Sequence, residues 1–129
     1  MKKLLLTLLI TVTCLSIMKA QTPTTAAGKM LRHVVLFKFK DDASTADVKK
    51  VETAFKNLPS QIKEIKGFEW GTNNSPENLN QGFTHSFFLS FNSEEDRAVY
   101  LPHPAHKAFG ALLTPFLDKV LVIDYWTKD

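Results

Sequence analysis

The stretch from Tyr100 to Gly110 reads Tyr-Leu-Pro-His-Pro-Ala-His-Lys-Ala-Phe-Gly and separates two predicted helices. Proline disfavours the α conformation at the residue before it, so Pro102 ends a helix that arrives near Tyr100. Pro104 suits the first position of a new helix, where its missing N–H group costs nothing. His106 then falls in the first turn of this second helix. The kink therefore predicts a phenol and an imidazole close to each other.

A phenol and an imidazole in reach of each other can perform general acid–base chemistry. The partial positive charge at a helix N-terminus favours the neutral form of His106, which can accept a proton. A structural alternative stays open, in which Tyr100 and His106 bond only to fix the kink. His103 lies where an N-cap belongs, and we expect its ring to satisfy free N–H groups of the second helix.

The first twenty residues predict an export signal. Met-Lys-Lys precedes an uncharged run from Leu4 to Met18, which is too short to span a bilayer comfortably, and Ala20 offers a cleavage point. Because Met18 occupies a position that usually holds a small residue, an uncleaved membrane anchor is the alternative. Residues 21–30 are interpreted as a flexible tether and residues 31–129 as one domain. We expect an exported protein, periplasmic or secreted, with no membrane segment after cleavage.

Charge and cysteine content exclude several classes of function. The signal holds three of the 16 Lys and Arg residues, so the mature chain is balanced against its 13 acidic residues. This balance gives no support for nucleic-acid binding. The single cysteine, Cys14, leaves with the signal, and with it any disulfide, thiol nucleophile or zinc–thiolate site. We expect no metal site, because Asp124 is the only carboxylate near the histidine-bearing stretches. No cofactor is expected either.

Hydrophobic periodicity predicts the order strand, helix, strand, strand, helix, strand. Alternating apolar residues indicate strands at 31–40 and 83–91, and shorter strands are expected at 68–71 and 120–127. Helical spacing runs from Thr45 to Pro59, and a second helical region surrounds the proline kink. This order is typical of the split βαβ, ferredoxin-like arrangement. The fold prediction is α+β, with a four-stranded antiparallel sheet that carries helices on one face.

Both faces of the predicted sheet are apolar. We expect the face without helices to carry His33, Val35, Phe37, Phe87, Leu89, Val120 and Val122. A sheet that exposes such a face to water is an aggregation hazard, and two sheets that pair face to face remove it. The sequence therefore predicts a homodimer, whose paired sheets would also enclose a space.

Four motifs carry a resemblance to a known family. They are His33-Val-Val-Leu-Phe-Lys-Phe39, Gly82-Phe-Thr-His85, Tyr100-x-x-His-Pro-x-His-x-x-Phe-Gly110 and Val122-Ile-Asp-Tyr125. Over nearly all of residues 31–128 the chain resembles the stress-response A/B barrel (Dabb) proteins. The resemblance implies a ferredoxin-like dimeric α/β barrel.

Within that family, a plant cyclase folds a linear polyketide by aldol condensation. The resemblance implies that Tyr100 and His106 form the corresponding acid–base pair, and that His33 and His85 match the other two notable histidines of that cyclase. Phe55 stands where the cyclase has a pocket tyrosine. A substrate cavity in this chain should therefore differ in size.

Tyr100 and His106 are thus the candidate catalytic residues. The residues expected to line an apolar substrate cavity are His33, Val35, Phe37, Phe55, His85, Phe87, Phe109, Gly110 and Val122. For His33 and His85, a core histidine with satisfied hydrogen bonds is the alternative.

Two functions remain open. The first is a cofactor-free lyase or cyclase that acts on a small apolar carbonyl compound. The second is a non-catalytic, stress-related or ligand-binding homo-oligomer. A closed apolar cavity that reaches Tyr100 and His106 favours the first function, whereas a cavity filled by phenylalanine rings favours the second.

Overall fold

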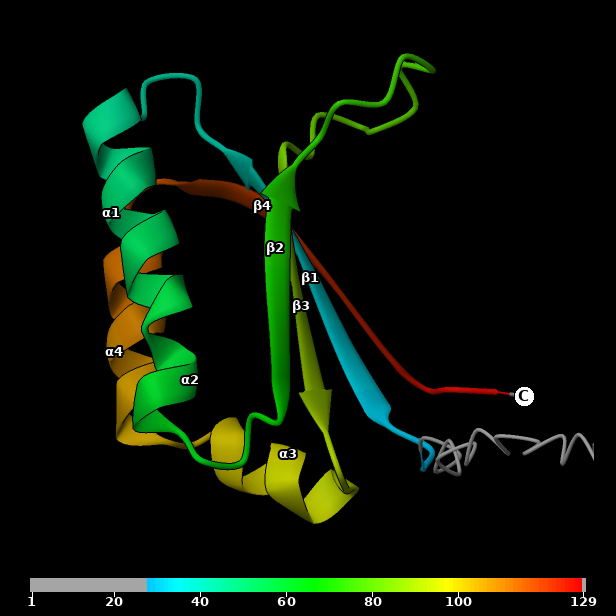
Figure 1. Ribbon diagram of the computed structural model, residues 1–129. Coiled ribbons are helices and arrows are strands. Elements are labelled where there is room, and N and C mark those ends of the chain that lie inside the picture. The colour runs from blue at the N-terminus through cyan, green and yellow to red at the C-terminus, as the bar shows by residue number, and fades with distance from the viewer. Residues whose placement is uncertain (1–27, 129) are drawn as a thin grey trace, which may run out of the picture.

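The computed structural model describes residues 28–128. Its strands are β1 (Leu31–Phe39), β2 (Gly67–Thr72), β3 (His85–Phe91) and β4 (Leu117–Trp126). Its helices are α1 (Thr45–Lys56), α2 (Leu58–Gln61), α3 (Glu94–Tyr100) and α4 (Pro104–Leu113). Helices α1, α2 and α4 lie together on one side of the sheet, and α3 lies near one end of it (Figure 1).

The four strands form one antiparallel sheet in the order β2-β3-β1-β4. The central strand β1 pairs on one side with β3 and on the other with β4, so that Val35 lies opposite Phe87 and Val122. Together with the helices on one face, this topology confirms the predicted α+β, ferredoxin-like fold.

Local capping sets where the helices begin. The Ser44 hydroxyl accepts a hydrogen bond from the backbone N–H of Asp47, and the Ser93 hydroxyl accepts one from Asp96, as N-cap serines do. The first predicted helix is divided, because α1 ends at Lys56 and Pro59 lies in the first turn of α2. Proline is tolerated in that turn, so Pro59 takes part in a helix start rather than a helix end.

The prediction of which residues occupy the open face of the sheet was wrong. The residues assigned to that face, His33, Val35, Phe37, Phe87, Leu89, Val120 and Val122, share the side on which the helices pack. The ring of Phe37 lies 5.9 Å from that of Phe55 on α1, which fixes this orientation. Alternation gives each strand two sets of side chains, and in β1 the second set holds Arg32 and Lys38 as well as Val34 and Leu36. The helices cover the more apolar of the two sets.

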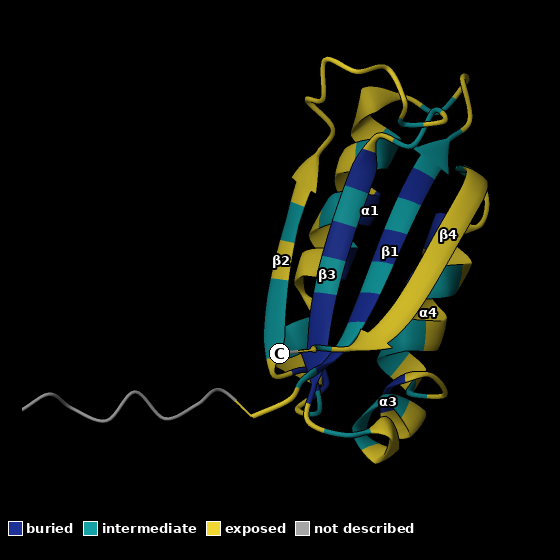
Figure 2. Cartoon of the chain, turned by 90° about the vertical axis from the view of Figure 1, so that its right-hand side faces the viewer, coloured by how far each residue is buried: buried dark blue, intermediate teal, exposed yellow. Residues whose placement is uncertain are grey.

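The open face carries Val34, Leu36, Phe88, Leu121, Ile123 and Tyr125, together with the polar residues Arg32, Lys38, Ser86, Ser90 and Lys119. Its apolar part is the surface that the dimer prediction would cover, and strand β4 is exposed along almost its whole length (Figure 2). In β1 and β3, buried residues alternate with half-buried ones. An apolar edge strand of ten residues is the kind of surface that natural proteins cover.

The predicted export signal, residues 1–20, lies outside the described residues, as does most of the predicted tether. Residues 28–30 run as irregular chain into β1. Within the part of the chain that the structure describes, no helix combines the length and the apolar character needed to span a bilayer.

Candidate active site

A cavity of about 350 Å³ lies between the helix-covered face of β1 and β4 and the helices α3 and α4. Its lining residues are His33, Val35, Phe37, Phe55, Tyr100, Leu101, His106, Phe109, Gly110, Leu113, Val120, Val122 and Asp124. Most of these side chains are apolar, and the polar ones gather at His33, Tyr100, His106 and Asp124. The cavity therefore suits a small apolar molecule that carries one polar end.

The proline kink brings Tyr100 and His106 together as the sequence predicted. Tyr100 ends α3, His106 lies in the first turn of α4, and their ring centroids are 4.3 Å apart. His103 forms the N-cap of α4, where its Nδ1 accepts a hydrogen bond of 3.1 Å from the backbone N–H of Ala105. This contact agrees with the structural role expected for His103.

The tautomer of His106 follows from its backbone contact. Its Nδ1 lies 2.9 Å from the carbonyl oxygen of Leu101. A carbonyl oxygen can only accept a hydrogen bond, so Nδ1 must carry the proton and donate it. In the neutral ring, Nε2 then has a free lone pair. His106 is thereby prepared to accept a proton at Nε2.

Tyr100 is a donor in this site. Its side chain is only 1% exposed, and burial, with a smaller contribution from the nearby Asp124 carboxylate, raises the pKa of its phenol well above the ordinary value of 10.0. Among residues 28–128, no buried side-chain oxygen or nitrogen is left without a partner. The Tyr100 hydroxyl forms no hydrogen bond with any described residue and therefore borders the open space of the cavity.

His33 enters the site through an ion-pair network. Its Nδ1 lies 2.6 Å from Oδ1 of Asp124, and Nη1 of Arg97 donates to Oδ2 of the same carboxylate over 2.7 Å. The ring of His33 also meets the ring of Tyr100 edge to face, at 5.6 Å. Burial lowers the pKa of His33 below its ordinary value of 6.5, although the hydrogen bond with Asp124 acts in the opposite direction. His33 is therefore neutral near pH 7.

Two of the residues expected to line the cavity lie elsewhere. His85 lies on β3 near α1, away from the cavity. Its Nδ1 is 2.8 Å from the Thr84 hydroxyl and its Nε2 is 3.2 Å from Glu52 on α1. Phe87 packs behind the cavity wall against Phe55, with ring centroids 4.1 Å apart. The structure assigns both side chains to the core between β3 and α1.

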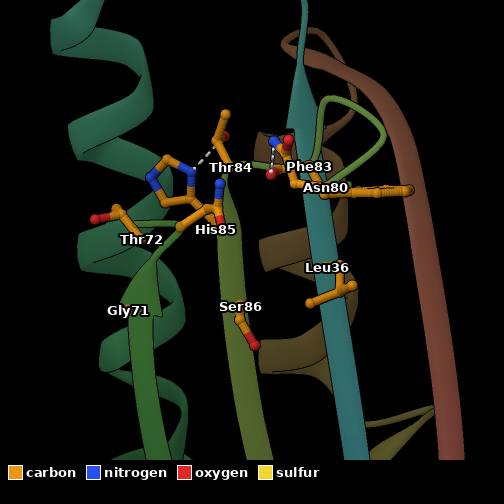
Figure 3. A pocket seen from close by; sticks show the side chains of 9 residues that line it. Leu36, Gly71, Thr72, Asn80, Phe83, Thr84, His85 and Ser86 are labelled. Carbon is orange, nitrogen blue, oxygen red and sulfur yellow. Dashed lines mark hydrogen bonds between the residues drawn. The ribbon is translucent and has the colours of Figure 1, made fainter. Parts of the chain in front are cut away.

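His85 instead borders a smaller hollow of about 260 Å³ at one end of the open face. Figure 3 shows the side chains that line this hollow, which come from β1, β2, β3 and the loop before β3, with the ring of His85 bonded to Thr84. Its lining residues are Leu36, Gly71, Thr72, Asn73, Asn80, Phe83, Thr84, His85 and Ser86. Both nitrogens of His85 are already bonded, so this hollow lacks a free titratable group of the kind found beside Tyr100.

Residues 31–127 match the sequence profile of the Stress responsive A/B Barrel Domain family, Dabb. The chain belongs to the Dabb family. The predicted family resemblance is thereby confirmed, and the Dabb domain spans all of the strands and helices given above.

Two plant proteins are similar to this Dabb domain in sequence. The stress-response A/B barrel domain-containing protein HS1 of Arabidopsis thaliana is 44% identical over 95 residues, which cover 74% of this chain and 87% of HS1. Olivetolic acid cyclase of Cannabis sativa is 33% identical over 95 residues, which cover 74% of this chain and 94% of the cyclase.

Solved structures show the same fold. A hydroxynitrile lyase from Passiflora edulis has a TM-score of 0.73 and 26% identity, with 78% of this chain and 94% of the lyase covered. A dimeric protein with a ferredoxin-like fold from Bacteroides fragilis has a TM-score of 0.63 and 28% identity, with 76% of this chain and 96% of that chain covered.

Asp124 and Arg97 are the functional candidates that sequence reasoning missed in this Dabb domain. Asp124 was considered only as a metal ligand, and within residues 28–128 no group of three or more His, Cys, Asp or Glu side chains could hold a metal ion. Strand pairing places Asp124 beside His33, because the two residues lie directly opposite each other on β4 and β1. The sequence alone does not reveal which residues pair between two strands when those residues are 91 positions apart.

Proposed function

We propose that this Dabb protein is a cofactor-free lyase or cyclase that acts on a small, apolar carbonyl compound. The observation that supports this proposal most strongly is the Tyr100–His106 pair, with ring centroids 4.3 Å apart, in the wall of a mostly apolar cavity. The lone pair on Nε2 of His106 and the hydroxyl of Tyr100 supply an acceptor and a donor at one end of that cavity.

The proposed reaction starts with a proton transfer. Nε2 of His106 takes a proton from a carbon next to the carbonyl group, and the electron pair of that C–H bond moves toward the carbonyl oxygen. The Tyr100 hydroxyl donates a hydrogen bond to the resulting enolate oxygen. The enolate carbon then forms a bond to a second carbonyl carbon in a cyclase, or in the reverse direction a carbon–carbon bond breaks in a lyase. The imidazolium returns its proton to the product.

The named relatives support this class of reaction. One relative in sequence is called a cyclase. One protein that shares the fold of this chain is called a hydroxynitrile lyase. Phe37, Phe55 and Phe109 line the cavity without filling it, which favours a ligand over a solid core.

Proton exchange tests the proposal without knowledge of the natural substrate. The mature protein is incubated with 2-heptanone in D2O, and replacement of hydrogen by deuterium next to the carbonyl is followed by NMR. We expect the wild type to accelerate exchange, and His106→Gln to lower the rate by a factor of about 100 to 10,000. His85→Gln is the matched control, because His85 lies outside the cavity, and its rate per folded molecule should equal that of the wild type.

The ligand-binding alternative predicts a different result. If 2-heptanone and a panel of other small apolar ketones and aldehydes raise the melting temperature but show no accelerated exchange, the catalytic proposal is overturned. The protein would then bind carbonyl compounds without converting them.

We also propose that the protein is a homodimer and is exported. The apolar open face around Ile123 and the dimeric relative from Bacteroides fragilis support the dimer. The basic start and apolar run of residues 1–20 support export to the periplasm or the medium. N-terminal sequencing of the protein from its native host should give Gln21 as the first residue, and a soluble cytoplasmic protein that retains Met1 would contradict export.

A further inference from the structure

We propose that Arg97 is a positioning residue which, through Asp124, holds the proton of His33 on Nδ1 and so presents Nε2 of His33 to the cavity as a second proton acceptor. The role of His33 as a second proton acceptor rests on the proposed function. The contacts among Arg97, Asp124 and His33 do not depend on that function, because they are properties of the folded chain alone.

The network joins three separate elements. His33 comes from β1, Asp124 from β4 and Arg97 from α3. Each carboxylate oxygen of Asp124 has its own partner, since Oδ1 meets Nδ1 of His33 at 2.6 Å and Oδ2 meets Nη1 of Arg97 at 2.7 Å. With both oxygens engaged, the carboxylate is held against rotation, and such charge-assisted contacts are the short and strong ones. An ionised carboxylate can only accept, so Nδ1 of His33 donates.

Three of the elements packed against His33 present titratable or charged groups to it, whereas β3 presents the apolar Phe91. These groups are Asp124 on β4, Arg97 and Tyr100 on α3, and His106 on α4. Burial lowers the pKa of His33, and the charges of His106 and Arg97 lower it further, whereas Asp124 raises it. Arg97 thus opposes the tendency of the carboxylate to turn His33 into an imidazolium. A neutral ring with its proton on Nδ1 is the result.

The free nitrogen of His33 opens onto the cavity. Nε2 bonds to no residue in the described part of the chain, yet no buried side-chain nitrogen or oxygen there lacks a partner. Nε2 therefore borders open space, and His33 is one of the residues that line the cavity. The same end of the cavity then holds two acceptor nitrogens, on His33 and His106, with the Tyr100 hydroxyl as a donor. A ligand with a hydroxyl group near its carbonyl would satisfy all three groups.

Arg97 itself does not line the cavity, so it acts on the site only through Asp124. An ion pair that merely fastens α3 to β4 would stabilise the fold but would leave the protonation of His33 unchanged. Imidazole ¹⁵N NMR spectra separate these roles, because they report which ring nitrogen carries the proton and at which pH the ring titrates.

The experiment uses the full mature chain, labelled with ¹⁵N in its histidines. In the wild type we expect His33 to carry its proton on Nδ1 alone at a pH where the ring is neutral. Arg97→Gln should give a mixture of the two neutral tautomers and should raise the pKa of His33. Arg97→Lys keeps the positive charge and should restore most of the wild-type behaviour. Asp124→Asn should move the proton to Nε2, because the asparagine amide can donate to Nδ1.

Lys38→Gln is the matched control. Lys38 forms an ion pair with Asp118 that also joins another element to β4 over 2.7 Å, but it has no contact with His33. This variant should leave the tautomer and titration of His33 unchanged. The proposal is overturned if Arg97→Gln keeps the wild-type tautomer and pKa, or if Lys38→Gln alters them equally. A tautomer change in a protein that shows no deuterium exchange would support the positioning role and overturn only the proposed function.

Discussion

The ring of Phe55 on α1 stacks on the ring of Phe87 on β3, with centroids 4.1 Å apart and planes inclined by 22°. Both side chains are almost completely buried. This contact fastens α1 to the centre of the sheet and forms the support behind the cavity wall. It also explains why Phe87 belongs to the core rather than to the ligand site.

Phe87→Ala should destabilise the fold without direct loss of a ligand contact. Removal of a buried phenylalanine ring typically lowers the free energy of unfolding by about 3–5 kcal/mol, because apolar contacts are lost and a cavity remains. Urea unfolding followed by circular dichroism measures the change. Leu79→Ala is the control, since Leu79 is 71% exposed, and it should stay within about 0.5 kcal/mol of the wild type. Equal stability of the two variants would contradict the assigned core.

Tyr100→Phe should lower the rate of proton exchange more than it lowers ligand binding. The variant keeps the buried ring and loses only a hydroxyl that bonds to no described residue, so the fold should be little affected. Loss of one donor to a developing oxyanion typically costs about 100- to 1,000-fold in rate. Exchange of 2-heptanone gives the rate and titration calorimetry gives the affinity. A variant with unchanged exchange would exclude the phenol from the chemistry.

Stability should fall as the pH drops below the ordinary titration range of histidine. The folded-state pKa of His33 is lowered from 6.5, mainly by burial. Between these two pKa values the unfolded chain binds a proton that the folded chain does not, so stability rises with pH in that window. The contribution is fully present above pH 6.5 and is lost as the pH falls through the lower, folded value.

Urea unfolding at pH 7.5 and at pH 5.5 measures this loss. His33→Gln removes the titrating group, and its stability should change less between the two pH values than that of the wild type. An equally steep change in the variant would assign the pH dependence to another group.

Ile123→Glu should convert the proposed dimer to a monomer. Ile123 is 49% exposed on the open face, and a carboxylate buried there between two sheets would be unpaired. Val99→Glu is the control, because Val99 is 48% exposed but lies on α3, away from the open face. Analytical ultracentrifugation at micromolar concentration should show a monomer for the first variant and a dimer for the second. A monomeric wild type would contradict the dimer itself.

The sequence predicted the fold well because its signals are local. Alternation along 31–40 and 83–91 places β1 and β3 to within a few residues, and helical spacing from Thr45 places the start of α1. The start of β4 was predicted three residues late. Phe116 accepts a hydrogen bond from Lys40, and the register shifts between Lys38 and Phe39, so pairing with β1 begins earlier than β-branched composition indicates.

The site was predicted only as far as neighbours along the chain could show it. Tyr100 and His106 meet because six positions and two prolines separate them, which is a local relationship. The Asp124–His33 contact depends on the pairing of two distant strands, and the place of His85 depends on which side of the sheet the helices cover. The open face of β1 also carries the apolar residues Val34 and Leu36, so Arg32 and Lys38 gave only a weak signal for the side that the helices cover.

The first and last strands of the domain lie side by side, and their ends are tied by hydrogen bonds between Met30 and Thr127. The polar end of the cavity thus joins His33 from one end of the chain to Asp124 from the other. Pairing between strands so far apart in the chain is intrinsically slow, because the entropy of closing the intervening loop opposes it before any contact forms. A nascent or truncated chain without β4 carries Tyr100 and His106 but has no assembled chamber around them. The complete site would therefore form only when the final strand docks, and a chain still lacking β4 during synthesis would have no activity.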